Sequence, residues 1–241
     1  MAAKLNIGTS GWHYEDWRGD FYPDHLDPSE MLSHYCRHFS TVEINSSFYR
    51  LPTEETLSEW RRTVPNDFCF SVKASRYITH MKKLTDFRRP LETFLNRIRV
   101  LQNRLGPILF QLPPRWKFNP ERLTAFVGGL PAGFRFVLEF RDAGWYARRA
   151  FDILSDHGVA LCIHDMNGSV APKEITAEFI YVRLHGPRTY AGRYDKQTLS
   201  GWAGAFSSWR RQGKEIFCYF NNDAQGHAPR NASELKQMLE S

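Results

Sequence analysis

The chain of 241 residues has the length of one barrel-sized domain, and its 42% hydrophobic and 24% charged residues are ordinary for a folded globule. This composition excludes a disordered, collagen-like or low-complexity chain. The net charge of +6 at pH 7 is compatible with an anionic partner without proving one. Apolar runs such as 159–163 fall far short of the roughly 18 residues that a membrane span needs, so no membrane partner is expected.

Two features predict a cytoplasmic protein. The first residues contain no apolar segment of the kind found in a secretory signal peptide. The cysteines are widely spaced, without a C-x-x-C pair, which indicates buried thiols in a reducing compartment. They are Cys36, Cys69, Cys162 and Cys218. We therefore expect no disulfide, no bound metal and no cofactor.

Strand-like and helix-like segments alternate along the chain, as in a parallel α/β sheet. The predicted strands are 5–9, 42–45, 68–73, 108–111, 136–140, 160–164, 180–185 and 216–221. A doubly wound sheet would carry a G-x-G-x-x-G turn after its first strand, and GTSG at 8–11 lacks that spacing. Eight units without this turn predict a single (β/α)8 TIM-like barrel over residues 1–241.

Helix signals lie between the strands. Asp27 offers an N-cap, followed by Pro28 and by an acid three residues after the cap, and Asn231 with Glu234 repeats this pattern for the last helix. Two apolar stripes at helical spacing predict buried helix faces: Leu91, Phe94, Leu95, Ile98 and Leu101, then Trp202, Phe206 and Trp209. The connection 165–178 is short and contains Pro172, so we expect an irregular sixth βα unit.

Several strands alternate apolar and polar residues, although a parallel sheet is normally covered on both faces. In 135–142, Phe136 and Leu138 share one face, whereas Glu139 and Arg141 share the other. A barrel explains this pattern, because the apolar face packs against the helices and the polar face points inward. The polar residues also come late in each strand, toward the C-terminal mouth where barrel enzymes place their sites.

The inward polar residues are therefore predicted to converge on one site. They are Glu43, Asn45, Lys73, Gln111, Glu139, Arg141, His164, Arg183, His185 and Asn221. Arg141, Arg183 and Lys73 would hold an anion, and Glu139 or His185 would transfer a proton, with Lys73 beside them as a further catalytic candidate. The alternative is that Glu139 pairs with an arginine and Glu43 with Lys73 only to plug the barrel, because an unpaired buried charge is costly.

Three loops are expected to border the mouth. Loop 8–23 carries Trp12, Tyr14, Trp17 and Tyr22, which either stack on a base or sugar or pack against one another. Loop 185–194 interleaves Arg188 and Arg193 with Tyr190 and Tyr194, which suits an anionic group next to a ring, with a plain solvated loop as the alternative. The third loop contains Asn221, Asn222 and Asp223, which bind polar ligand groups or cap the turn.

Seven segments together resemble a known family. They are GTSGWHYEDWRGDFYP (8–23), VEINSSFYRLP (42–52), FSVKASRYITHMKKL (70–84), LGPILFQLPP (105–114), FVLEFRDAGW (136–145), YVRLHGPRTYAGRY (181–194) and YFNNDAQGHAPRNA (219–232). In this order they resemble the domain-of-unknown-function 72 proteins, also called YecE-like, over nearly the whole chain. The resemblance implies a TIM-like barrel. It implies neither an activity nor catalytic residues, so the candidate site rests on the strand alternation.

Three functions remain open. The first is an enzyme, a hydrolase or isomerase, acting on an anionic substrate that is phosphorylated or related to nucleic acid. The second is a nucleic-acid-binding module without chemistry. The third is a metal-dependent nuclease or sugar isomerase with Glu139, Asp165, His185 and Asp223 as ligands, although no tight ligand spacing supports it. A Schiff-base role for Lys73 is less favoured, because a lysine beside acids is more often paired.

Overall fold

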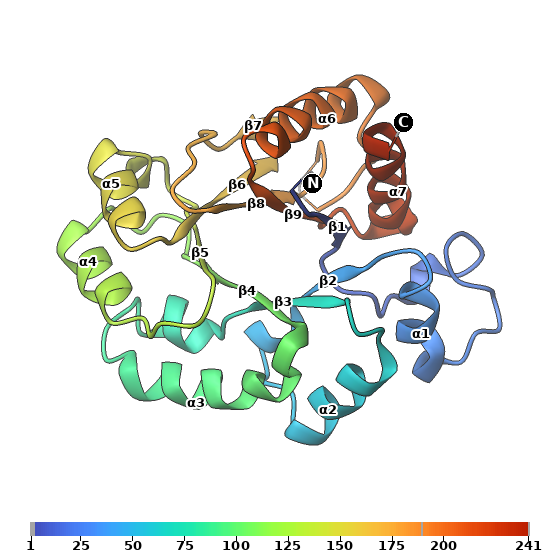
Figure 1. The fold of residues 1–241 in the computed structure, drawn as a ribbon, viewed down its shortest axis with the longest axis horizontal. Helices are drawn as coiled ribbons and strands as arrows, with labels where there is room; N and C mark the ends of the chain where they lie inside the picture. The colour runs from blue at the N-terminus through green and yellow to red at the C-terminus, as the bar shows by residue number, and fades with distance from the viewer. Residues whose placement is uncertain (1–2, 189, 241) are drawn as a thin grey trace.

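The computed structural model describes residues 3–188 and 190–240. Eight parallel strands of this part are arranged around a common axis, with the helices outside them (Figure 1). They are β1 (Leu5–Thr9), β2 (Thr41–Ile44), β3 (Cys69–Lys73), β4 (Leu105–Gln111), β5 (Phe136–Glu139), β6 (Ala160–Met166), β8 (Phe179–Leu184) and β9 (Glu215–Phe220). Their order is β1-β9-β8-β6-β5-β4-β3-β2, and β7 (Ser169–Val170) pairs with β6. The predicted (β/α)8 barrel is confirmed.

Seven α-helices of the described residues form the outer layer (Figure 1). They are α1 (Met31–Tyr35), α2 (Glu54–Thr63), α3 (Arg88–Ile98), α4 (Pro120–Gly128), α5 (Arg148–Asp156), α6 (Lys196–Arg211) and α7 (His227–Glu240). Between β6 and β8 the chain forms only β7 and irregular backbone, so the expected irregular sixth unit is confirmed. No helix of the described residues is both long and apolar enough to cross a membrane.

The helix signals are confirmed in three places and wrong in one. The Asp27 carboxylate accepts the backbone N–H of Ser29 at 2.8 Å and caps the turn that leads into α1. The apolar stripes of α3 and α6 are buried. Asn231, however, lies inside α7, which begins at His227. Its buried amide binds the backbone N–H and carbonyl of Tyr194, so a tertiary contact takes the place of the predicted cap.

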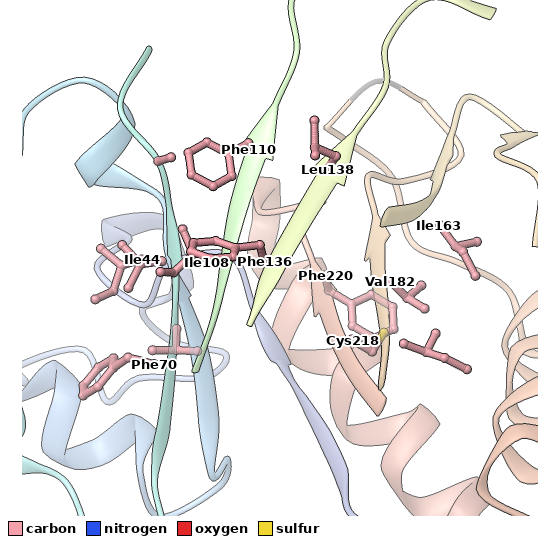
Figure 2. Close-up of a cluster of buried hydrophobic side chains, with 14 of the residues drawn as sticks. Ile44, Phe70, Ile108, Phe110, Phe136, Leu138, Ile163, Val182, Cys218 and Phe220 are labelled. Atoms are coloured by element: carbon pink, nitrogen blue, oxygen red, sulfur yellow. The ribbon is translucent and has the colours of Figure 1, made fainter. Parts of the chain in front are cut away.

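The two faces of the strands lie as the alternation predicts. Outward side chains such as Phe136, Leu138 and Phe110 belong to the large cluster between barrel and helices, part of which Figure 2 shows. The Phe110 ring lies 5.0 Å from that of Phe126 in α4. A separate inward cluster fills the lower barrel: Cys69, Leu109, Val137, Ala160, Cys162, Phe179, Tyr181, Phe217 and Tyr219. Because a one-residue slip would exchange the two faces, the predicted register is confirmed.

The seam between β1 and β2 closes the barrel through a side chain. The Tyr35 hydroxyl of α1 accepts the Thr9 N–H at 2.9 Å and donates to the Thr41 carbonyl at 3.0 Å. Gly8 permits this close approach, because a Cβ there would lie 2.2 Å from the Thr41 oxygen. One step further on, Ser10 and Glu43 form a single parallel bridge. The seam thus brings Ser10 beside the first inward carboxylate.

Candidate functional site at the barrel mouth

Arg183 of β8 lies at the centre of the inward polar residues. Its Nη1 donates to Glu139 Oε2 and its Nη2 to Glu43 Oε1, both at 2.8 Å. All three side chains are fully buried. Glu43 also accepts the Ser10 hydroxyl at 2.5 Å and the Tyr181 hydroxyl at 2.6 Å. The arginine and both carboxylates therefore form a buried ion triad below the mouth, in which Arg183 Nε has no hydrogen-bond partner in the described chain.

The triad shows which basic residue pairs with each of the two inward carboxylates. Glu139 pairs with both Arg183 and Arg141, as the structural alternative predicts. Glu43 pairs with Arg183 across the barrel, and no ion pair joins it to Lys73 in the described chain. Tyr181 and Ser10, which complete the triad, are missing from the sequence-based site. Tyr181 shares the inward face of its strand with Arg183, so the same alternation carries its signal.

Arg141 and His185 form the layer above the triad. The Arg141 Nε pairs with Glu139 Oε1, and its Nη2 donates to His185 Nε2 at 3.1 Å. A guanidinium can only donate, so His185 Nε2 is the acceptor and the ring proton lies on Nδ1, 2.9 Å from the Asn221 amide. The Asn221 atom at that distance is the amide nitrogen Nδ2, so this tautomer requires the amide to be turned by 180°, which places its oxygen against the ring. His185 is therefore a neutral imidazole that orients Arg141.

Neither Glu139 nor His185 changes its protonation near neutral pH. Burial acts to raise the pKa of Glu139, but the adjacent Arg141 and Arg183 hold that pKa well below its ordinary value. Burial, together with the positive charge of Arg183, lowers the pKa of His185 to about 3. The carboxylate thus stays ionised and the imidazole stays neutral over the physiological range.

Lys73 ends β3 and its side chain is only 7% exposed. Its Nζ lies 4.1 Å from the centroid of the Phe48 ring. Within the described chain, Nζ has no hydrogen bond and no carboxylate within 4.0 Å. The backbone is held separately, because the Ser47 hydroxyl donates to the Lys73 carbonyl at 2.6 Å. Burial is the main cause that lowers the pKa of Lys73 to about 8.

Asp223 follows β9 and lies beside Tyr14 of the first loop. Its carboxylate Oδ1 is buried and has no hydrogen-bond partner in the described chain. Burial raises the pKa of Asp223 to about 7. The Tyr14 hydroxyl donates to the Ser10 carbonyl at 2.7 Å, and the Trp17 indole donates to the Asp223 carbonyl at 2.9 Å. Burial thus outweighs the hydrogen bond from Tyr14, which acts to lower the pKa of Asp223, and leaves that pKa near neutral pH.

A cleft of about 530 Å³ adjoins the mouth beside the first loop. Its walls include Trp12, Tyr14, Asn45, Tyr49 and Trp60, and we call it the aromatic cleft. The buried Oδ1 of Asn45 has no partner in the described chain. Sequence reasoning did not find Tyr49 and Trp60, because they lie outside the strands.

The remaining aromatics of the first loop have a structural role. Trp17 and Tyr22 are fully buried, and their rings stack with centroids 5.9 Å apart. For these two residues, the alternative that the loop packs by its own aromatics is confirmed. Trp12 and Tyr14 alone of the four candidates face the aromatic cleft.

The second and third loops divide between the mouth and the periphery. Tyr190 is exposed, and its ring lies 5.3 Å from that of His185, so it borders the mouth. Arg193 instead pairs with Glu234 of α7 and lines a separate cleft. The Asn222 amide donates to the Gly192 carbonyl at 2.8 Å and holds this loop in place.

The structure also places three further sequence candidates. Arg188 is exposed, and residue 189 of the same loop lies outside the described residues. Gln111 ends β4 partly exposed, in register with Glu139. His164 of β6 is nearly buried, and its ring lies 6.1 Å from that of His185.

The candidate metal ligands do not form a cluster. Asp165 lies one residue after His164 on β6 and so faces away from the barrel interior, where Tyr194 and Trp202 hydrogen-bond its carboxylate. In the described ranges, no three His, Cys, Asp or Glu side chains are grouped closely enough to hold a metal ion. The four cysteines are unpaired thiols.

The family model described as "Protein of unknown function DUF72" matches residues 6–241. The chain belongs to the DUF72 family. It is 27% identical to UPF0759 protein YunF of Bacillus subtilis over 98% of this chain and 95% of YunF. It is 34% identical to UPF0759 protein YecE of Escherichia coli over 120 residues, which are 48% of this chain and 43% of YecE.

Solved structures agree with this assignment. A DUF72 family protein from Thermotoga maritima superimposes with a TM-score of 0.90 at 30% identity, covering 99% of this chain and all of that one. A second, from Enterococcus faecalis, has a TM-score of 0.84 at 19% identity over 98% of this chain and 96% of its own, which supports the fold. The names of these DUF72 relatives state no activity. The function is therefore argued from the site.

Proposed function

We propose that this DUF72 protein is an enzyme that binds an anionic substrate at the barrel mouth through Arg141. The observation that carries this proposal is the incomplete pairing of that guanidinium. Glu139 and His185 engage its Nε and Nη2, whereas the one hydrogen-bond partner of Nη1 among the described residues is the sulfur of Met166, at 2.9 Å. A thioether is a weak acceptor, so an oxyanion would replace it with a gain in hydrogen bonding.

The charge balance of the mouth supports the same substrate class. Three basic side chains, Arg141, Arg183 and Lys73, stand against the two carboxyl side chains Glu43 and Glu139. His185 is neutral, and Asp223 is largely protonated below pH 7. An excess of positive charge in a mostly dry site attracts an anion more strongly than the same excess in water.

The aromatic cleft supports a substrate that carries a ring. The segment 45–49 connects it to the mouth, because Asn45 and Tyr49 line the cleft whereas Phe48 lies under Lys73. A sugar or base in the cleft would stack on Trp12 or Trp60 and bond the unpartnered Asn45 oxygen. A phosphorylated sugar or nucleotide combines both requirements.

The residues then take distinct roles. Arg141 holds the anion, and Glu139 and His185 position Arg141 rather than move protons, since neither titrates near neutral pH. Asp223 is the proton-transfer group, because its pKa of about 7 matches the working range of a general acid or base. Arg183 lies beneath, where its two carboxylates keep it from the substrate.

Ligand binding by the Arg141→Lys variant tests this proposal. Inorganic phosphate and adenosine 5′-monophosphate should raise the melting temperature of the parent protein through linkage. Arg141→Lys keeps the positive charge but loses the planar guanidinium with its several donors. Loss of one charged hydrogen bond, about 1.5–3 kcal/mol, should raise Kd by roughly 10- to 100-fold. The matched control is Arg193→Ala, whose pair with Glu234 lies outside the mouth. Equal weakening in both variants, or no binding by the parent, would refute the proposal.

A nucleic-acid-binding module without chemistry is the second candidate. The observation that favours it is a set of exposed tyrosines, Tyr49, Tyr77 and Tyr190, on a chain of net charge +6. Exposed rings stack on unpaired bases, and the charge attracts the backbone. A steep fall in oligonucleotide affinity with salt, without turnover of any phosphorylated compound, would favour this candidate over the enzyme.

A further inference from the structure

Lys73 is a buried amine to which the ion network of the barrel gives no partner. The two neighbouring carboxylates are already engaged, Glu43 by Arg183 and Glu139 by both Arg183 and Arg141. No hydrogen bond reaches Nζ within the described chain, and Nζ lies over the face of the Phe48 ring. The reason for disfavouring a Schiff base from the sequence, that a lysine beside acids is usually paired, therefore does not hold here.

This environment favours the neutral form of the amine. Lys73 as a residue is only 7% exposed, so its ammonium group loses part of its hydration, and no carboxylate within 4.0 Å in the described chain compensates for it. The positive charges of Arg183 and Arg141 add to the effect, against the weaker pull of Glu139 and Glu43. Lys73 therefore carries a free electron pair on a minority of molecules near neutral pH, but on far more of them than a lysine in water does.

The place of Lys73 in the fold directs that electron pair toward a substrate. It ends strand β3 at the C-terminal mouth, the end of a barrel where bound ligands meet the strands. The segment that carries Phe48 also lines the aromatic cleft. Arg141 is near enough for its charge to act on the pKa of Lys73, so an anion held by Arg141 would lie near Nζ.

We propose that Lys73 is a nucleophile that forms an imine with the carbonyl group of an anionic aldehyde or ketone. Nζ attacks the carbonyl carbon, the C=O π pair moves to oxygen, and transfer of the amine proton gives a carbinolamine. Protonation of the hydroxyl releases one water molecule and leaves a C=N bond, without oxidation or reduction. Hydrolysis by the same steps in reverse restores the amine.

An imine at this position would withdraw electrons from the carbon next to the former carbonyl. The reaction class is then proton transfer or bond cleavage at that carbon, in a phosphorylated sugar or a similar carbonyl compound. The choice of an anionic substrate rests on the proposed function of Arg141. The reactivity of Lys73 does not, so the two can be tested separately.

Borohydride trapping on the unmodified protein is the test. The protein is incubated at pH 7.5 with dihydroxyacetone phosphate, reduced with sodium borohydride, digested and mapped by mass spectrometry. Lys73 should be labelled about tenfold or more faster than Lys117, whose side chain is 86% exposed and serves as the internal reference. The measurement needs no variant, so a folding defect cannot mimic a negative result. Labelling of Lys73 no faster than that of Lys117 overturns the inference.

Dihydroxyacetone, the same ketone without phosphate, separates this inference from the anion site. Preferential labelling of Lys73 by both compounds at equal rates supports the imine and refutes the role of Arg141. If Lys73 is labelled faster by the phosphorylated compound, and the Arg141→Lys variant loses that preference, the result supports both the imine at Lys73 and the anion site at Arg141. In every case the Lys73→Arg variant should lose the label at that peptide while labelling at Lys117 stays unchanged.

Discussion

Replacing Glu139 by glutamine tests the ion triad. The substitution keeps the shape of the side chain and removes its charge. Arg183 then retains Glu43 alone, and Arg141 loses its only carboxylate among the described residues. The new amide also presents a donor to two guanidinium groups that only donate. Glu139 and Arg183 are fully buried, so water cannot replace the partner that Arg183 loses.

The expected loss of stability is large. Removing one partner of a buried ion pair costs about 3–5 kcal/mol, because the remaining charge stays buried. A protein of this length loses roughly 2–4 °C in melting temperature for each kcal/mol, so the variant should melt about 6–20 °C lower. The matched control is Glu121→Gln, whose pair with Arg149 lies at the surface and should contribute no more than about 1 kcal/mol.

The pH dependence gives a second, independent check. The pKa of Glu139 in the folded state lies well below the ordinary value of 4.5, so its contribution is complete above that value and is lost as the pH falls toward the folded pKa. The difference in unfolding free energy between parent and variant, from urea titrations, should therefore be constant from pH 6 to 8 and shrink below about pH 4.5. A loss under about 1 kcal/mol at pH 7 would refute the triad as a stabilising unit.

Two further predictions concern the seam and the titrating carboxyl. Gly8→Ala places a methyl group 2.2 Å from the Thr41 oxygen and should lower the unfolding free energy, measured by urea titration, by about 1–3 kcal/mol. The control is Gly201→Ala, in open space on α6, which should be neutral or stabilising. Equal effects of the two substitutions would contradict the close approach of Gly8 to Thr41. Asp223→Asn should gain stability relative to the parent as the pH rises from 5 to 7 and then level off, because a raised folded pKa makes the parent lose stability over that window. A difference that does not vary with pH would show that Asp223 titrates normally.

The sequence by itself determined the barrel and the faces of its strands. The alternation of side chains along a strand is a local property. In Phe136–Glu139, successive side chains point to opposite faces of the sheet regardless of the rest of the chain. Because the apolar face packs against the helices, Glu139 must point into the barrel. The eight strands and the irregular sixth unit followed from equally local signals, such as Pro172 in the connection after β6. For the same reason, the inward direction of Lys73 and Arg183 was predictable.

Only the tertiary structure decided which inward groups meet. Glu43 of β2 reaches Arg183 of β8 across the barrel, although these strands are not neighbours in the sheet. That contact depends on the curvature and stagger of all eight strands, which no window of sequence contains. Glu43 therefore pairs with Arg183 and not with Lys73, the partner that the structural alternative had offered. Closure of the barrel also buries Asp223 beside Tyr14. Burial by distant parts of the chain sets the pKa values of Lys73 and Asp223, so the strand pattern that placed these residues at the mouth could not predict those values.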